Sequence, residues 1–159
     1  MRVLGIDPGY DRCGLAVMEY QNGRETLLYS HCIETNRKTP LFDRLYTIGE
    51  AVAVVLATEQ PNALAIETLY FNKNITTGIG VAEARGIILY LAKKHHLTLY
   101  EYGPQEVKVA VTGYGNSDKT AVYAMVQRLV ENVPEKARDD EYDAIAVAIT
   151  ALAQAGRTH

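Results

Sequence analysis

The stretch Arg2–Tyr10 constrains the fold most strongly, because it reads as a buried strand that ends in a carboxylate. The apolar run Val3-Leu4-Gly5-Ile6 leads directly into Asp7, and Pro8-Gly9 then stops the strand. A charge at the end of a buried strand is costly unless a cation neutralises it. Ligands also collect outside the carboxyl ends of strands in sheets flanked by helices. Asp7 alone is equally explained as the start of a solvated turn, so other converging carboxylates decide the question.

Two further segments bring carboxylates into the same kind of position. The short apolar run Ala63–Ile66 ends at Glu67, which repeats the arrangement around Asp7. Asp140 and Asp143 stand three residues apart at the start of a helix, so they share one face. The residues after Asp143 are almost wholly apolar, which turns this face toward the core. Acidic residues in a first turn also complement the helix dipole, and that explanation is strong for their neighbours Asp139 and Glu141.

The order of the elements predicts an α/β domain with a five-stranded mixed sheet flanked by helices, and one domain over residues 1–159. Asn22-Gly23 between two strand-like runs indicates a β-hairpin. Glycines within the second helix suggest close approach of another backbone, so this helix is the predicted dimer interface; packing within the chain is the alternative. The expected strands lie within 2–10 and at 12–20, 26–33, 63–66 and 97–102, and the expected helices at about 40–59, 76–94, 105–111, 117–130 and 139–155.

The two cysteines predict the register of that hairpin. A two-residue turn at Asn22-Gly23 pairs positions whose numbers add up to 45, so Cys13 and Cys32 should face each other. Residues 1–20 lack a basic start followed by an apolar run, and we expect no apolar stretch long enough to span a membrane. We therefore expect a cytoplasmic protein whose cysteines stay thiols.

The four carboxylates Asp7, Glu67, Asp140 and Asp143 predict a site for divalent cations. Hard oxygen ligands suit Mg²⁺ or Mn²⁺, and the lack of a Cys/His cluster argues against zinc. Without a cation, clustered carboxylates raise one another's pKa. With two cations, one activates water and the other stabilises the leaving oxygen of a phosphodiester.

Four motifs in this order resemble RuvC, the bacterial Holliday-junction resolvase family: Gly5–Gly9, Ala65–Glu67, Ala84–Gly86 and Asp140–Thr150. The resemblance implies an RNase H-like fold, a homodimer that works with the RuvA–RuvB branch-migration complex, and magnesium-dependent paired nicking of a four-way DNA junction. It places the family's catalytic carboxylates on Asp7, Glu67, Asp140 and Asp143, its basic residues near the cut strand on Lys108 and Lys119, and its junction-facing aromatic on Tyr70.

The net charge of −3 does not by itself indicate nucleic-acid binding, but it becomes +1 once four carboxylates are neutralised by cations. Phe71 lies beside Tyr70, and we expect one of the two rings to contact DNA and the other to close the core. Local phosphate contacts are predicted from a set of basic residues, of which several are expected to be solvated only: Lys73, Arg85, Lys93, Lys94, Lys108, Lys119 and Arg128.

Three other functions remain open on the sequence. An actin-like or sugar-kinase-like phosphotransferase also ends its first strand in Asp and a glycine turn, but that fold needs two such domains. A non-catalytic junction-binding protein would not need all four carboxylates. An RNase H-like nuclease that acts on RNA would share the carboxylates. The loop that carries Tyr70 and the helix expected at about 76–94, as a dimer interface, favour a DNA junction as the substrate over RNA.

Overall fold

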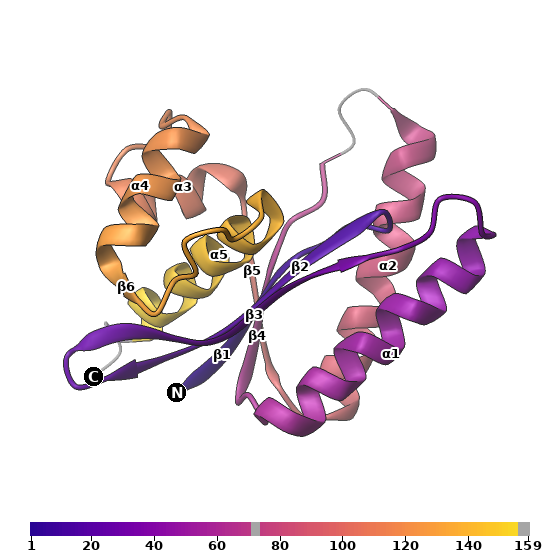
Figure 1. Cartoon of the computed structure of the whole chain (residues 1–159), viewed down its shortest axis with the longest axis horizontal. Helices are drawn as coiled ribbons and strands as arrows, with labels where there is room; N and C mark the ends of the chain where they lie inside the picture. Colours follow the sequence, from indigo (N-terminus) through magenta and orange to yellow (C-terminus); the bar gives the residue numbers. More distant parts are fainter. Residues whose placement is uncertain (71–73, 156–159) are drawn as a thin grey trace.

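The computed structural model describes residues 1–70 and 74–155, and within them the chain folds around one six-stranded mixed sheet (Figure 1). The strand order is β5-β4-β1-β2-β3-β6. The strands are β1 (Arg2–Asp7), β2 (Arg12–Gln21), β3 (Arg24–Glu34), β4 (Ala63–Glu67), β5 (Thr98–Tyr102) and β6 (Val130–Glu131). The helices are α1 (Leu41–Glu59), α2 (Ile75–Lys94), α3 (Pro104–Thr112), α4 (Lys119–Leu129) and α5 (Asp139–Ala155).

The sheet is mixed because β1 pairs antiparallel with β2 and parallel with β4. The predicted fold class is confirmed, but the predicted count of five strands was one too low. The sixth strand is β6, a two-residue segment that pairs in parallel with the start of β3. The sequence pattern places Val130 at the end of the preceding helix and assigns Glu131 to no element, since two residues carry no period by which a strand can be recognised.

Helices cover both faces of the sheet, with α1 and α2 on one side and α3, α4 and α5 on the other (Figure 1). The period of two in a strand sends alternate side chains to the two layers. In β1, Leu4 and Ile6 pack with the α1–α2 layer, whereas Val3 packs with the α5 layer. Gly5 also faces α5, and a Cβ atom there would lie 2.2 Å from the carbonyl oxygen of Ala144. The missing side chain therefore allows α5 to lie directly on β1.

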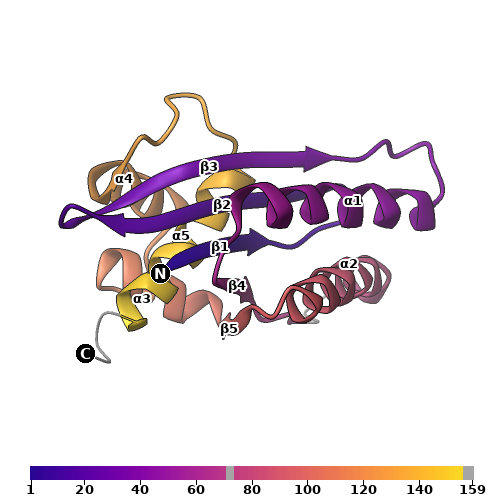
Figure 2. The same ribbon diagram turned by 90° about the horizontal axis from the view of Figure 1, so that it is seen from below.

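The β2–β3 hairpin forms at the predicted turn (Figure 2), and its register is the predicted one from Gln21/Arg24 to Met18/Leu27 but not beyond. Asn22 and Gly23 both have positive φ, as a two-residue hairpin turn requires. A β-bulge at Val17/Met18 then shifts the pairing by one residue, so Cys13 pairs with Ile33 and Cys32 with Gly14. The prediction that the two cysteines face each other was wrong. Both are free and buried.

Helix α2 is long and apolar enough to cross a membrane by length and composition, with a hydropathy of 1.3 over its most apolar stretch. The expectation that no stretch has this property was wrong on that criterion. Core helices of soluble proteins also meet it, and one such helix is weak evidence for a membrane span. One side of α2 packs on the α1 layer through Ala84, Ile88 and Ala92. Ile75, Ile79 and Tyr90 are exposed.

Candidate active site

The ends of β1 and β4 bring the first two carboxylates together. The two strands are parallel, and their register pairs Gly5 with Ala65 and Ile6 with Ile66. The next residue in each strand is Asp7 or Glu67, so the two acids stand at neighbouring strand ends. Both follow the period-two alternation onto the face that α5 covers. The sequence predicted that both acids stand at strand ends, because each apolar run leads directly into a carboxylate.

The first turn of α5 brings Asp140 and Asp143 to the same place. This turn lies against β2 because Gly14 has no side chain: a Cβ atom there would stand only 1.9 Å from the carbonyl oxygen of Asp140. The helix continues as a nearly unbroken buried surface from Tyr142 to Leu152. The apolar sequence after Asp143 therefore holds the acids over the sheet, and Gly14 sets the distance.

One cavity of about 490 Å³ joins these residues. The four carboxylates Asp7, Glu67, Asp140 and Asp143 all line it. Its other walls carry basic side chains from three elements: Arg12 from β2, Lys108 from α3 and Lys119 from the first turn of α4. The structure thus brings together all six residues that the sequence predicts as catalytic, and it adds Arg12, which the sequence analysis did not single out.

Two of the four carboxylates are paired with cations of the protein itself. Arg12 Nε lies 3.3 Å from Asp140 Oδ2, and Lys119 Nζ lies 3.2 Å from Asp143 Oδ2. The Tyr123 hydroxyl donates to Asp143 Oδ1 at 3.4 Å, and the Cys32 thiol donates to Asp140 Oδ2 at 3.7 Å. These contacts orient the two α5 carboxylates. Neither Tyr123 nor Cys32 carries a local sequence signal for this role.

Burial and crowding make ionisation of the strand-end acids unfavourable. Desolvation, followed by the charges of Asp143, Glu67 and Asp140, raises the pKa of Asp7 to about 8. Desolvation also raises the pKa of Glu67 and that of Asp143, although the Lys119 ammonium opposes both increases. An added cation would relieve this repulsion.

The donor set fits Mg²⁺ or Mn²⁺, because it consists of carboxylate oxygens from four positions around one cavity. As the side chains stand in residues 1–70 and 74–155, no three His, Cys, Asp or Glu groups are close enough to hold one ion. Asp140 and Asp143 are instead ion-paired with Arg12 and Lys119, respectively. A bound cation would therefore compete with Arg12 and Lys119 for the negative charge of these two carboxylates.

The residues predicted to bind DNA lie in different settings. Tyr70 is 61% exposed and borders a small pocket at the start of α3, outside the carboxylate cavity. Arg85 does not line that cavity: it is ion-paired with Glu101, and its Nε donates to the carbonyl oxygen of Glu67 at 3.3 Å. Arg85 therefore supports the end of β4. Phe71 and Lys73, the other two predicted contacts, lie outside the described residues.

Comparison with known proteins gives concordant results. A family model described as crossover junction endodeoxyribonuclease RuvC matches residues 3–151. Proteins of that description from Heliobacterium modesticaldum and Thermotoga petrophila are 42% and 40% identical, over 94% and 93% of this chain and 92% and 90% of their own lengths. The solved structure of T. thermophilus RuvC in complex with a Holliday junction substrate superposes with a TM-score of 0.92 at 30% identity, covering 99% of this chain and 96% of that one.

Proposed function

Because the chain belongs to the RuvC family of crossover junction endodeoxyribonucleases, we propose that it cuts four-way DNA junctions at the cavity lined by Asp7, Glu67, Asp140 and Asp143. The chain is a Holliday-junction-resolving endonuclease of RNase H-like fold. This membership decides against the phosphotransferase, RNA-directed and non-catalytic alternatives. The observation that carries the assignment of the site is that four carboxylates and three basic side chains line one cavity.

Family membership implies dependence on a divalent cation, and we propose two Mg²⁺ ions per subunit, with Mn²⁺ able to replace them. When bound, such ions activate water and stabilise the charge on the leaving oxygen of a phosphodiester. Asp7 and Glu67 would hold them from the rigid strand ends, and Asp140 and Asp143 from the first turn of α5. Incubation of the protein with labelled four-way junction and linear duplex, with and without Mg²⁺, tests this function: only the junction with Mg²⁺ should be nicked, in paired strands.

The chain's own cations have a second role once the carboxylates hold metal. Lys108 and Lys119 line the cavity from α3 and α4, so their ammonium groups can contact a phosphate that lies over the carboxylates. In the metal-free protein, desolvation lowers the pKa of Lys119, but the Asp143 charge and hydrogen bond outweigh it and raise the pKa overall, so the side chain is cationic at neutral pH. A fixed positive charge stabilises the extra negative charge of a pentavalent transition state.

Replacing Lys119 with Ala should slow single-turnover junction cleavage about 10²–10³-fold, the usual cost of losing one charge-stabilising donor, and weaken junction binding much less. The matched control is Lys136→Ala, which removes an exposed lysine from the loop before α5 and should leave both quantities unchanged. Rapid-quench cleavage and equilibrium binding measure the two effects. An equal loss of binding and cleavage would make Lys119 only a phosphate anchor.

We propose that Tyr70 stacks on a base exposed where the strands of the junction exchange. Its ring is exposed at the end of the segment that leaves Glu67, and base–aromatic stacking contributes about 1–3 kcal/mol per base. Tyr70→Ala should therefore lose junction cleavage and keep the melting temperature, whereas Tyr70→Phe should keep most of the activity because it retains the ring. If Tyr70→Ala instead melts much earlier and cuts normally per folded molecule, Tyr70 belongs to the core.

We also propose that the protein is a cytoplasmic homodimer that acts with the RuvA–RuvB branch-migration complex. A two-fold dimer offers one site to each of the two symmetry-related strands of the junction. The exposed apolar residues of α2 (Ile75, Ile79 and Tyr90) supply the candidate interface. Gly86 leaves open space on this helix, whereas Gly80 makes room for the ring of Tyr10 within the chain. A monomer in light scattering at micromolar concentration that nicks paired strands fully would contradict this assembly.

A further inference from the structure

A second, smaller depression adjoins the active site on the side of the β1–β2 turn. It has a volume of about 210 Å³ and shares Arg12 and Asp140 with the carboxylate cavity. Its other lining residues include Gly9 from the turn, Arg37 from the segment before α1 and Thr77 from the first turn of α2. Neither Lys108 nor Lys119 lines it. The depression therefore extends the site away from the two lysines.

The charges around this depression leave Arg37 without a full counter-charge. Asp11 is ion-paired both with Arg37, whose Nη2 lies 3.1 Å from Asp11 Oδ2, and with Arg44. Arg44 is buried and ion-paired with Asp11, so it neutralises that carboxylate from the protein interior. Its burial also keeps it from contacting a ligand at the surface. The Arg37 side chain is 77% exposed. Two guanidinium groups share one carboxylate, and the exposed one carries the surplus positive charge.

Arg12 becomes available by a different route. Its side chain is 51% exposed and is ion-paired with Asp140. If Asp140 holds a cation, as the proposed function requires, that cation neutralises the carboxylate charge that now balances Arg12. The Arg12 guanidinium then stands at the shared wall of the two cavities without a full counter-charge. A guanidinium is well suited to a phosphate group, because its planar fork of N–H donors matches two phosphate oxygens.

The turn that carries Arg12 is braced from both neighbouring helices. The carbonyl oxygen of Tyr10 accepts hydrogen bonds from Thr35 Oγ1 and from Arg44 Nη2, the latter at 3.2 Å. The Arg44 guanidinium also lies 5.0 Å from the centre of the Tyr10 ring. On the other side the ring packs where Gly80 of α2 has no side chain, since a Cβ atom there would lie 2.7 Å from it. Bracing of this kind lowers the ordering cost of ligand binding.

We propose that Arg12 and Arg37 form a phosphate subsite for the DNA strand that is cut, holding a phosphodiester that flanks the scissile bond. The strand would run from Lys108 and Lys119, across the carboxylates, to the β1–β2 turn. This inference rests on the proposed function, since it extends the path of the same substrate. Arg37 supplies a standing positive charge, and Arg12 adds a second one when Asp140 holds a cation.

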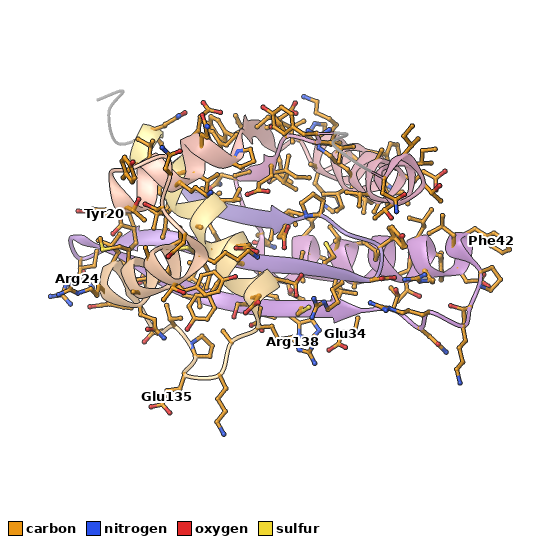
Figure 3. All side chains as sticks on the ribbon, turned by 90° about the horizontal axis from the view of Figure 1, so that it is seen from above. Tyr20, Arg24, Glu34, Phe42, Glu135 and Arg138 are labelled. Carbon is orange, nitrogen blue, oxygen red and sulfur yellow. The ribbon has the colours of Figure 1, made fainter. Side chains whose placement is uncertain are left out.

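The test compares Arg37→Gln with Arg24→Gln, both made in an Asp7→Asn background that binds the junction without cutting it. The two arginines are closely matched: Arg24 is 70% exposed and ion-paired with Glu131 at 3.1 Å, but it lies near the tip of the β2–β3 hairpin (Figure 3). Arg37→Gln leaves Asp11 paired with Arg44, so it creates no unpaired carboxylate. The measurement is the dissociation constant of a labelled four-way junction in Mg²⁺ over a range of salt concentrations.

Arg37→Gln should weaken junction binding and reduce the slope of log K against log salt by about 0.9, the contribution of one phosphate contact. Arg24→Gln should change neither. Arg12→Gln should reduce the slope by a similar amount, an effect that loss of the Asp140 contact alone would not produce. A methylphosphonate at the contacted position beside the scissile bond should abolish the difference between Arg37→Gln and its parent. Neutral linkages elsewhere should preserve that difference.

The possible failures are distinguishable. An Arg37→Gln slope equal to that of its parent, in a protein that binds the junction, would overturn the phosphate subsite and leave the proposed function intact. Equal effects of Arg37→Gln and Arg24→Gln would overturn it as well, because they would reflect net charge and not position. A wild-type protein that neither binds nor nicks the four-way junction would instead overturn the proposed function.

Discussion

Replacing Asp7 with Asn should abolish junction cutting and leave junction binding close to that of the wild-type protein. Asp7 stands at the end of the central strand β1, beside Glu67 and beneath the first turn of α5. Asn keeps the shape of the side chain but loses its charge, and with it most of its affinity for a hard cation. Loss of one charge-stabilising group costs about 10²–10³ in rate, and because Asp7 is a proposed cation ligand we expect a decrease at the upper end, about a thousandfold, in single-turnover cleavage.

The same substitution, although it abolishes cutting, should stabilise the metal-free protein at high pH. The pKa of Asp7 is raised from 3.8 to about 8 by burial and by the neighbouring carboxylates, so the folded state binds this proton more tightly than the unfolded state. The corresponding stabilisation is fully present below about pH 4 and is lost as the pH rises to about 8. Asn cannot ionise, so the metal-free Asp7→Asn protein does not lose stability as the pH rises. It should therefore melt at a higher temperature than the wild type at pH 8 but not at pH 4.

Thermal melts in a chelator at the two pH values measure this difference, and added Mg²⁺ should raise the melting temperature of the wild type more than that of Asp7→Asn. Glu59→Gln serves as the control, because Glu59 is at the end of α1, outside the residues that line the carboxylate cavity. Full cleavage by Asp7→Asn in Mg²⁺ would remove Asp7 from the mechanism. An unchanged difference between pH 4 and pH 8 would show that Asp7 is not held at a raised pKa.

Gly14→Ala should be the most damaging single methyl group that can be added near the site. Its Cβ atom would lie 1.9 Å from the carbonyl oxygen of Asp140. The backbone fixes the position of the Cβ atom, and the oxygen is itself a backbone atom, so neither can rotate away. Overpacking of a core costs about 1–3 kcal/mol, occasionally more, and a clash with backbone belongs at the upper end. A loss of about 3 kcal/mol lowers the melting temperature of a chain of this size by about 6–12 °C.

The fraction that remains folded should also cut poorly, because α5 must lift from β2 and carry Asp140 and Asp143 away from Asp7. Gly115→Ala is the control: its Cβ atom would make only an ordinary contact of 3.4 Å with Val109, and both stability and cleavage should stay near wild type. Calorimetry and single-turnover cleavage measure the two effects. A Gly14→Ala protein with normal melting and normal cleavage would show that α5 does not need its close approach to β2.

The sequence by itself determined the five helices, five of the six strands and the four acidic residues of the site. β1 and β4 are short apolar runs that each lead directly into a carboxylate, so the sequence places Asp7 and Glu67 at the ends of two buried strands. The apolar run after Asp143 likewise predicts which side of α5 is buried. Such information is local, because the periods of strands and helices are properties of consecutive residues.

Only the tertiary structure decided which residues from distant segments meet. Arg12 pairs with Asp140, and Arg85 supports the Glu67 carbonyl instead of lining the cavity, although no local pattern separates these arginines from solvated ones. One β-bulge in the β2–β3 hairpin moved Cys32 opposite Gly14 and overturned the predicted pairing with Cys13. These outcomes depend on packing between chain segments, where the absence of one Cβ atom at Gly5 or Gly14 sets how closely a helix can approach the sheet.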